Sequence, residues 1–287
     1  MKDISSNDLT NNFPLAARSA EKERSVVRIL GTEIGGDSVV VIAGPCAVEN
    51  RDQLLDIAEN VKSRGALIIR GGAYKPLTFP YRSESFFELG EEGLRYLADA
   101  REKTGLPVVT EVMDPRLVDL VSEYADILQI GARNMQNFPL LNEVARVKKP
   151  VLLKRHFGCS LRDWLGAAEY ILHGGNPDVI LCERGIAAPH THQPTSRFIV
   201  DLQAVPAVHE FTHLPIIVDP SHSTFRRKYV APIARASVAA GADGIILDVH
   251  PTPEKAAVDP LQALNYEAFG ELMTEIQGIA GVIGRKI

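Results

Sequence analysis

Positively charged side chains lie in or just after four short apolar segments of this sequence. Arginine offers phosphate and carboxylate groups a planar fork of donors, whereas lysine supplies a mobile point charge. Cations that converge on one place repel one another unless an anion neutralises them. The set is larger than a single carboxylate needs, so it predicts a site for a compact dianion or trianion, such as a phosphorylated acid. The residues are Arg70, Lys75, Arg133, Lys154 and Arg184.

A second group of residues offers the donor atoms of a mixed metal site. Cys46, His222, Asp248 and Asp259 provide one thiolate, one imidazole and two carboxylates. Such donors suit a divalent metal, Mn, Fe, Co or Zn, with a position left open for substrate or water. The residues form no local ligand motif, however, and a lone cysteine is more often a small buried apolar residue. Spacing alone leaves the metal site and ordinary structural roles both open.

The elements that must position these residues alternate along the chain. Eight short apolar runs rich in β-branched residues suit strands that are covered on both faces. They span 39–44, 66–72, 107–112, 126–132, 150–155, 178–185, 215–221 and 244–250. Amphipathic segments with helical spacing lie between them and after the last, around 54–61 and 161–171 and at 89–104, 115–124, 137–147, 197–211, 226–240 and 265–279.

Eight strand and helix pairs predict an α/β protein with a single-domain (β/α)8 TIM barrel. A doubly wound open sheet has the same alternation, but no glycine-rich dinucleotide fingerprint supports it. In a barrel, the carboxyl ends of the strands meet at one mouth, so the cations and metal donors should lie together there. Residues 26–38 before the first strand predict a small hairpin that closes the bottom of the barrel, with Gly35 and Gly36 permitting a turn.

Composition narrows the class of protein. The chain has 287 residues, of which 45% are hydrophobic and 23% charged, with a net charge of -5 and no basic block. A nucleic-acid footprint, a polybasic membrane patch and a transmembrane run are therefore not expected. Three scattered cysteines without an apolar leader predict a reducing, cytoplasmic setting. We expect residues 1–25 to form a flexible or surface arm and residues 26–287 to form the barrel.

Eight motifs together resemble one enzyme family. In order they read IAGPCAVEN, RGGAYKP, TEVMD, QIGARNMQNF, LLKR, CERGI, VDPSH and GADG, and the match runs from about Val26 to about Met273. They are similar to the short type of 3-deoxy-heptulosonate-7-phosphate (DAHP) synthase, which is allied to 3-deoxy-octulosonate-8-phosphate synthase. The resemblance implies a barrel transferase of the shikimate pathway for aromatic amino acids, in the form of a homodimer or homotetramer. Its reaction joins phosphoenolpyruvate (PEP) to an aldose phosphate, erythrose 4-phosphate by default, and releases phosphate.

The resemblance also implies roles for residues. The five cations named above would hold PEP, while Cys46, His222 and Asp259 would ligate a divalent metal that polarises the aldehyde. The fourth ligand is glutamate in the family pattern EVHP, and Asp248 in DVHP is one methylene shorter, so its coordination is in question. Lys75 is predicted to transfer protons, and Glu111 or His222 to handle the water that adds at C2 of PEP.

Three departures from the family pattern lie where the aldehyde acceptor should bind. The stretch KPLTF replaces KPRTS, LLKRHFGCS replaces LLKRGMS, and AAPHTHQPTSRFIVDL replaces RTFETYTRNTLDL. A lost charge-assisted contact of about 1.5–3 kcal/mol would weaken a phosphate ligand by tens-fold or more. The predicted acceptor site comprises Pro76, Leu77, Thr78, Arg155, His156, His190 and His192. For the histidines, a plain surface loop is the alternative.

Several interpretations remain. The chain is an ordinary DAHP synthase in which Arg82, Arg155 or Arg197 replaces the lost arginine, or it uses the same PEP chemistry on a less phosphorylated or more apolar aldehyde. A catalytically silent relative with a binding or regulatory role is a further alternative. An unrelated metal hydrolase would not need five phosphate-binding cations.

Overall fold

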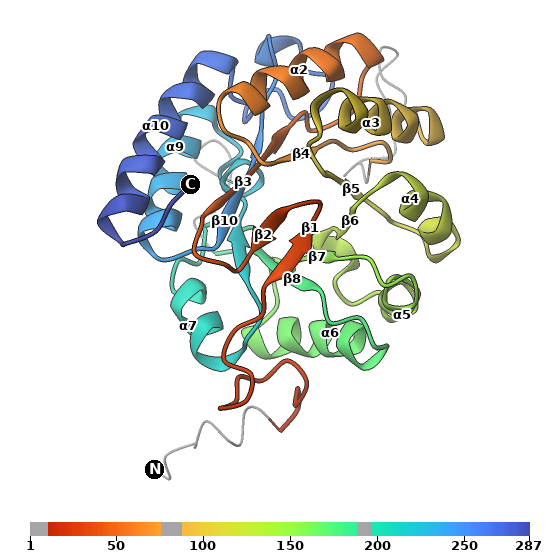
Figure 1. Cartoon of the computed structure of the whole chain (residues 1–287), viewed down its shortest axis with the longest axis vertical. Helices are drawn as coiled ribbons and strands as arrows, with labels where there is room; N and C mark the ends of the chain where they lie inside the picture. Colours follow the sequence, from red (N-terminus) through yellow and green to blue (C-terminus); the bar gives the residue numbers. More distant parts are fainter. Residues whose placement is uncertain (1–10, 76–87, 189–196) are drawn as a thin grey trace.

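Eight parallel strands form a closed barrel with helices around it (Figure 1). The computed structural model describes residues 11–75, 88–188 and 197–287. The strands are β3 (Val40–Gly44), β4 (Ile68–Arg70), β5 (Val108–Glu111), β6 (Ile127–Ile130), β7 (Val151–Lys154), β8 (Val179–Glu183), β9 (Ile216–Val218) and β10 (Gly244–Asp248). Each lies within a range predicted from the sequence. Pairing of β10 with β3 closes the sheet, which confirms the barrel and excludes the doubly wound alternative.

Helices follow the strands largely as predicted. The α-helices are α2 (Arg51–Ser63), α3 (Glu91–Thr104), α4 (Val118–Tyr124), α5 (Phe138–Arg146), α6 (Leu161–His173), α7 (Ala204–Phe211), α8 (Pro220–Thr224), α9 (Arg227–Ala239) and α10 (Tyr266–Val282). Short 3-10 turns are η1 (Pro115–Leu117), η2 (Ala132–Asn134) and η3 (Pro253–Lys255). The helix expected at 197–211 begins only at Ala204. Pro206 lacks the N–H that a helix interior requires, so it is accommodated in the first turn.

Side chains on each strand alternate between the inside of the barrel and the surrounding helices. Apolar residues such as Ile42, Ile68 and Leu152 fill the interior, whereas neighbours such as Val41 and Leu153 belong to the cluster between the sheet and the helices. This alternation follows from the period of two in a strand. It gives the barrel an apolar interior beneath its mouth.

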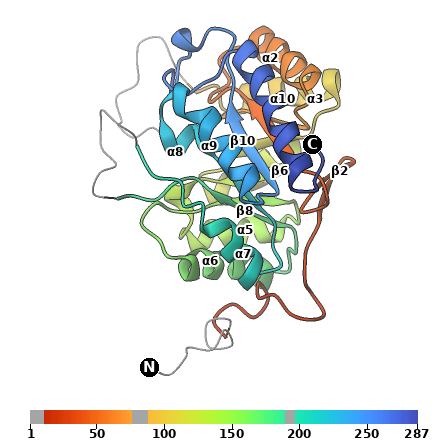
Figure 2. The same cartoon turned by 90° about the vertical axis from the view of Figure 1, so that its left-hand side faces the viewer.

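A hairpin covers the bottom of the barrel, as predicted. Strands β1 (Val27–Ile29) and β2 (Thr32–Ile34) pair antiparallel, and Val27, Ile29 and Ile34 join the interior cluster. Figure 2 shows the hairpin at the opposite end of the barrel from α8. The turn was expected at Gly35 and Gly36 but lies at Leu30 and Gly31, whose φ angles are 46° and 88°. Two positive φ angles match the twist of paired strands, and glycine accommodates them readily.

Residues 11–25 lie against the side of the barrel. Phe13 is buried, Ala17 forms an antiparallel bridge with Thr212, and the Glu169 carboxylate accepts the Leu15 N–H at 2.9 Å. The described part of the predicted arm is therefore a surface segment with defined contacts, and the division at residue 25 stays a prediction. No helix in the described ranges is both long and apolar enough to cross a membrane.

Candidate active site

A layer of polar side chains lies on top of the apolar barrel interior. Arg70 follows the interior residue Ile68 by two positions, and Lys154 follows Leu152 in the same way. Because a strand repeats every two residues, each polar side chain points to the same side as its apolar predecessor. The same spacing places Glu111, Gln129, Arg184, Asp219 and Asp248 above Val109, Ile127, Cys182, Ile217 and Ile246. The strand period thus aims seven polar groups at the mouth.

Five of these seven side chains, all except Asp219 and Asp248, line one cavity of about 140 Å³. All five predicted cations line it, namely Arg70, Lys75, Arg133, Lys154 and Arg184, and Arg197 adds a sixth. Two of the cations that line the cavity have a buried guanidinium nitrogen without a hydrogen-bond partner among the described residues, Nε of Arg70 and Nη1 of Arg184. Buried donors of this kind require an acceptor, so the cavity has the charge and the open N–H groups for an anion.

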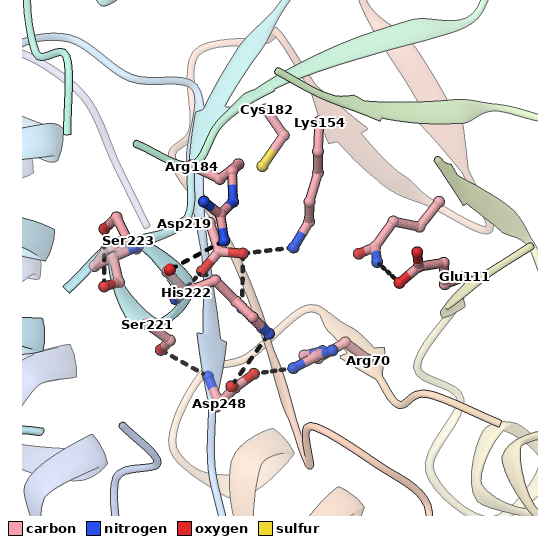
Figure 3. Close-up of polar contacts among 12 residues, drawn as sticks. Arg70, Glu111, Lys154, Cys182, Arg184, Asp219, Ser221, His222, Ser223 and Asp248 are labelled. Atoms are coloured by element: carbon pink, nitrogen blue, oxygen red, sulfur yellow. Dashed lines mark hydrogen bonds and ion pairs between the residues drawn. The ribbon is translucent and has the colours of Figure 1, made fainter. Parts of the chain in front are cut away.

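Two of the cations are held by buried carboxylates (Figure 3). The Lys154 ammonium lies 2.5 Å from Oδ2 of Asp219, and Arg70 contacts Oδ1 of Asp248. Arg184 instead donates from Nη2 to the backbone carbonyl of His222 at 3.1 Å. Burial lowers the pKa of Arg184 to about 10, which still leaves the guanidinium charged at neutral pH.

Three side chains in one wall of the mouth form a potential metal site. The Cys46 sulfur lies 3.3 Å from Oδ2 of Asp259 and 3.7 Å from Nε2 of His222, and all three donor atoms lie within 4.8 Å of one another. Burial raises the pKa of the Cys46 thiol, although Lys75 opposes this. Burial alone would also raise the pKa of Asp259, but His222 and Lys75 bring it below the usual value.

His222 is oriented by Asp219. Its Nδ1 lies 2.9 Å from Oδ2 of Asp219, and its backbone N–H donates to Oδ1 at 2.9 Å, so Asp219 also caps α8. Burial lowers the pKa of His222 to about 3, so the ring is neutral, which is the form that ligates a metal. Burial alone would raise the pKa of Asp219, but its cationic surroundings hold it well below the usual range. His222 and the Lys154 ammonium both lower the pKa of this carboxylate.

Asp248 lies beside the three-residue group but is engaged elsewhere. Its Oδ2 is 3.6 Å from Nε2 of His222 and 2.5 Å from Nε2 of Gln262, while Oδ1 meets Arg70. The cluster of potential metal ligands found among the described residues does not include it. A ligand role for Asp248 stays a prediction.

Lys75 and Glu111, the predicted proton carriers, both line the cavity. The Lys75 ammonium lies 3.0 Å from the Cys46 carbonyl oxygen and 3.3 Å from its sulfur, which places it between the potential metal site and the cations. The Glu111 carboxylate accepts a hydrogen bond from Gln129 at 3.2 Å.

The predicted acceptor residues are only partly described. Pro76, Leu77, Thr78, His190 and His192 lie outside the described residues. Arg155 follows Lys154 directly and therefore points to the other side of the strand, where it meets Glu183 at 3.0 Å and Asp201 at 2.8 Å. At Nδ1, His156 accepts the Gly158 N–H at 3.1 Å. Neither Arg155 nor His156 lines the cavity.

Other residues of the site had no predicted role. Asp219, which contacts Lys154 and His222 but does not line the cavity, had a sequence signal, because Asp-Pro after a strand is typical of a helix cap followed by proline at the first helical position. Phe157, Phe198 and Val258 form an apolar part of the wall. Phe157 and Phe198 lie in two of the three stretches that depart from the family pattern, but neither ring was itself predicted to line the site.

A barrel mouth with a cation cavity beside a thiol, an imidazole and a carboxylate defines a barrel enzyme with an anionic substrate. A sequence model of the DAHP synthetase I family matches residues 15–280. The phospho-2-dehydro-3-deoxyheptonate aldolase of Thermotoga maritima is 46% identical over 275 residues, which cover 96% of this chain and 80% of that protein. The 2-dehydro-3-deoxyphosphooctonate aldolase of Syntrophobacter fumaroxidans is 30% identical over 270 residues, covering 89% and 92%.

Comparison with solved structures finds relatives with the same activity names. A truncated 3-deoxy-D-arabino-heptulosonate 7-phosphate synthase from Thermotoga maritima superimposes with a TM-score of 0.88 at 44% identity, covering 96% of this chain and 99% of that one. A second Thermotoga maritima structure, of a phospho-2-dehydro-3-deoxyheptonate aldolase, gives a TM-score of 0.89 at 46% identity, covering 95% of this chain and 78% of that one. The chain belongs to the DAHP synthetase I family.

Proposed function

We propose that this protein condenses PEP with erythrose 4-phosphate, forming DAHP and inorganic phosphate. The main support is one observation: cations in or just after four strands line a single cavity, and two of their buried N–H groups have no partner among the described residues. A phosphate and a carboxylate on one small molecule supply the acceptors that these donors need. The similarity to Thermotoga DAHP synthase supports the same activity.

The cations have a direct part in this reaction. Arg70, Lys75, Arg133, Lys154 and Arg184 bind the phosphate and carboxylate of PEP and fix its orientation. C3 of PEP then forms a bond to the aldehyde carbon, water adds at C2, and the C2–O bond to phosphate breaks as the keto group forms. Donors fixed in advance stabilise the charge that gathers on the departing phosphate.

The donor set of Cys46, His222 and Asp259 fits a divalent metal, Mn, Fe, Co or Zn. Such an ion would supply Lewis-acid polarisation of the aldehyde oxygen. Asp219 fixes the ring of His222, as carboxylates do behind metal-ligating histidines. Asp248 remains a proposed fourth ligand.

Proton transfer falls to residues that line the same cavity. Lys75 is the proposed proton carrier, because its ammonium lies beside both the cations and Cys46. Glu111 or His222 would take the proton of the water that adds at C2. The Glu111 carboxylate faces the cavity and is almost fully buried, which suits a base shielded from bulk water.

The acceptor phosphate needs a further cation. Three arginines are candidates to replace the one missing from KPLTF: Arg197 lines the cavity, Arg155 does not, and Arg82 lies outside the described residues. We assign the phosphate of erythrose 4-phosphate to Arg197. This favours an ordinary phosphorylated acceptor over a more apolar aldehyde.

The test follows PEP consumption with Mn²⁺ and erythrose 4-phosphate, then with other aldehydes. We expect turnover with erythrose 4-phosphate, and for Arg197→Gln a KM for this substrate raised by about 10- to 100-fold, the range of one charge-assisted hydrogen bond. The KM for PEP should change far less. No turnover with erythrose 4-phosphate would overturn the proposal, and turnover with another aldehyde alone would establish a changed acceptor.

The protein is further proposed to act as a homodimer or homotetramer in a reducing cytoplasm. Its three cysteines are free, as such a compartment would keep them. Light scattering coupled to gel filtration measures the mass of the assembly, and a monomer at micromolar concentration would contradict the oligomer.

A further inference from the structure

Two phenylalanine rings form part of the cavity wall. Phe157 follows β7 and Phe198 precedes α7, and their ring centroids lie 5.0 Å apart with planes at 23°. The Arg184 guanidinium lies 4.4 Å from the centroid of Phe198. The Arg197 guanidinium lies 5.7 Å from the same ring and 5.1 Å from that of Phe225. Phe198 therefore contacts two of the cations that line the cavity.

The cavity holds its cations in two different ways. Lys154 and Arg70 each form an ion pair with a buried carboxylate, which cancels part of their charge. No carboxylate in the described ranges forms an ion pair with Arg184, whose contacts are the His222 carbonyl group and the Phe198 ring. An aromatic face attracts a guanidinium through its quadrupole and carries no net charge. Arg184 is thus fixed in place while its charge stays available to a ligand.

The position of Phe198 is itself built into the fold. Its N–H donates to the Ser223 carbonyl at 2.9 Å, and the next residue, Ile199, forms a bridge with Ile186. Gly185, which directly follows Arg184, has a φ of +98°, and a Cβ there would lie 2.6 Å from Cβ of Phe198. Only glycine leaves room for the ring beside the arginine. The contact between Phe198 and Arg184 is therefore a product of the local backbone.

We propose that Phe198 is a positioning residue of the anion cavity, whose ring holds the Arg184 guanidinium toward the phosphate of PEP without neutralising it. This rests on the proposed function, because it takes PEP as the ligand of Arg184. Phe157 supports the ring from the side. The range of cation–π energies from exposed to desolvated sites corresponds to a factor of about 2 to 30 in binding.

The test compares Phe198→Leu with Phe198→Tyr by calorimetric titration with PEP and with inorganic phosphate. Leucine keeps an apolar side chain without the ring face, whereas tyrosine keeps the face. We expect Phe198→Leu to bind both ligands about 5- to 30-fold more weakly and Phe198→Tyr to stay within about 2-fold of the wild type. In steady state, the KM for PEP should rise more than kcat falls. The matched control is Phe138→Leu, which removes a ring stacked 4.5 Å from that of Tyr170 outside the cavity and should change neither affinity.

A double-mutant cycle separates positioning from a general structural role. If Phe198 acts through Arg184, adding Phe198→Leu to Arg184→Gln should weaken PEP binding by less than about 2-fold more. Equal binding by Phe198→Leu and wild type, or an undiminished effect in the Arg184→Gln background, overturns the inference. A wild type that binds neither PEP nor phosphate overturns the proposed function with it. Should the leucine variant fail to fold, Phe198→Met replaces it.

Discussion

Asp219 connects the cation cavity to the potential metal site, and its replacement by asparagine should damage both. Its carboxylate lies 2.5 Å from the Lys154 ammonium and 2.9 Å from Nδ1 of His222. At an effective dielectric constant near 20, the lysine contact alone corresponds to a gross attraction of about 7 kcal/mol. Asparagine retains a hydrogen bond but no charge, and Lys154 would remain buried without a counter-charge.

The net loss in the free energy of unfolding is smaller than this gross attraction, because water and nearby groups relax around the unpaired lysine. Breaking a buried ion pair by removing one partner costs about 3–5 kcal/mol, and we expect the free energy of unfolding of Asp219→Asn to fall by that amount. Metal affinity should fall by about 10- to 100-fold, as when a carboxylate behind a ligating histidine is lost. Urea unfolding and calorimetric titration with Mn²⁺ measure the two effects.

The pH dependence gives an independent check. Because the pKa of Asp219 is lower in the folded protein than its ordinary value of 3.8, its contribution to stability is complete above that value. The contribution disappears as pH falls toward the folded pKa. The difference between wild type and Asp219→Asn should therefore be constant above about pH 5 and shrink below about pH 4.

The control is Asp114→Asn, in which a partly exposed carboxylate that pairs with the exposed Arg116 is replaced in the same way. We expect no measurable change in its unfolding midpoint, since exposed ion pairs contribute little. If Asp219→Asn lost less than about 1 kcal/mol and kept its metal affinity, the buried contacts of Asp219 would not have the energetic role assigned to them.

Three further predictions concern the metal site, the scaffold and the barrel bottom. Affinity for Mn²⁺ or Zn²⁺ should rise about tenfold per pH unit below the pKa of Cys46, because one thiol proton leaves on binding while His222 is already neutral; a slope of zero or two between about pH 6 and about pH 8 contradicts this. Arg155→Met should lower the free energy of unfolding by about 3–5 kcal/mol, because the carboxylates that pair with Arg155 would be left without a counter-charge. The affinity of the folded variant for PEP, measured by titration, should match that of the wild type. Ile34→Ala, which empties a buried position of the hairpin, should cost about 2–5 kcal/mol in chemical denaturation; a loss under about 1 kcal/mol would show that the hairpin does not seal the interior.

The fold could be predicted well from the sequence because the same strand and helix pattern occurs eight times along the chain. Each of the eight strands is an apolar run, each predicted helix has its own amphipathic face, and the barrel follows from their alternation. An error in one segment, such as the late start of α7 at Ala204, does not change the number of strand and helix pairs from which the barrel was predicted. The position of the hairpin was predicted correctly, but the position of its turn was not. Gly31 and Gly35 both have positive φ angles, and the sequence alone does not show which of them joins the two strands.

The cations could be predicted from the sequence because a barrel brings strand ends together whatever the loops do. The contact between the two rings of the aromatic wall could not be predicted, although Phe157 and Phe198 lie in two of the stretches that depart from the family pattern. Their contact depends on the path of the backbone at Gly185 rather than on any repeat. Glycine after a strand reads as a generic turn, so its role as space for a neighbouring ring appears only in three dimensions.

Lys154 and Arg155 are neighbours in the chain, but one lines the cavity and the other stabilises the surrounding scaffold. The two cations are adjacent, and both were assigned to substrates from the sequence. Since successive side chains point to opposite sides of a strand, they cannot both face the barrel mouth. Lys154 enters the cavity above Leu152, whereas Arg155 turns outward to Glu183, Asp201 and the face of Trp164. A residue two positions after an interior apolar residue points into the barrel, whereas a residue three positions after it points outward. This rule separates Lys154 from Arg155, and it also correctly selects Arg70, Glu111 and Arg184.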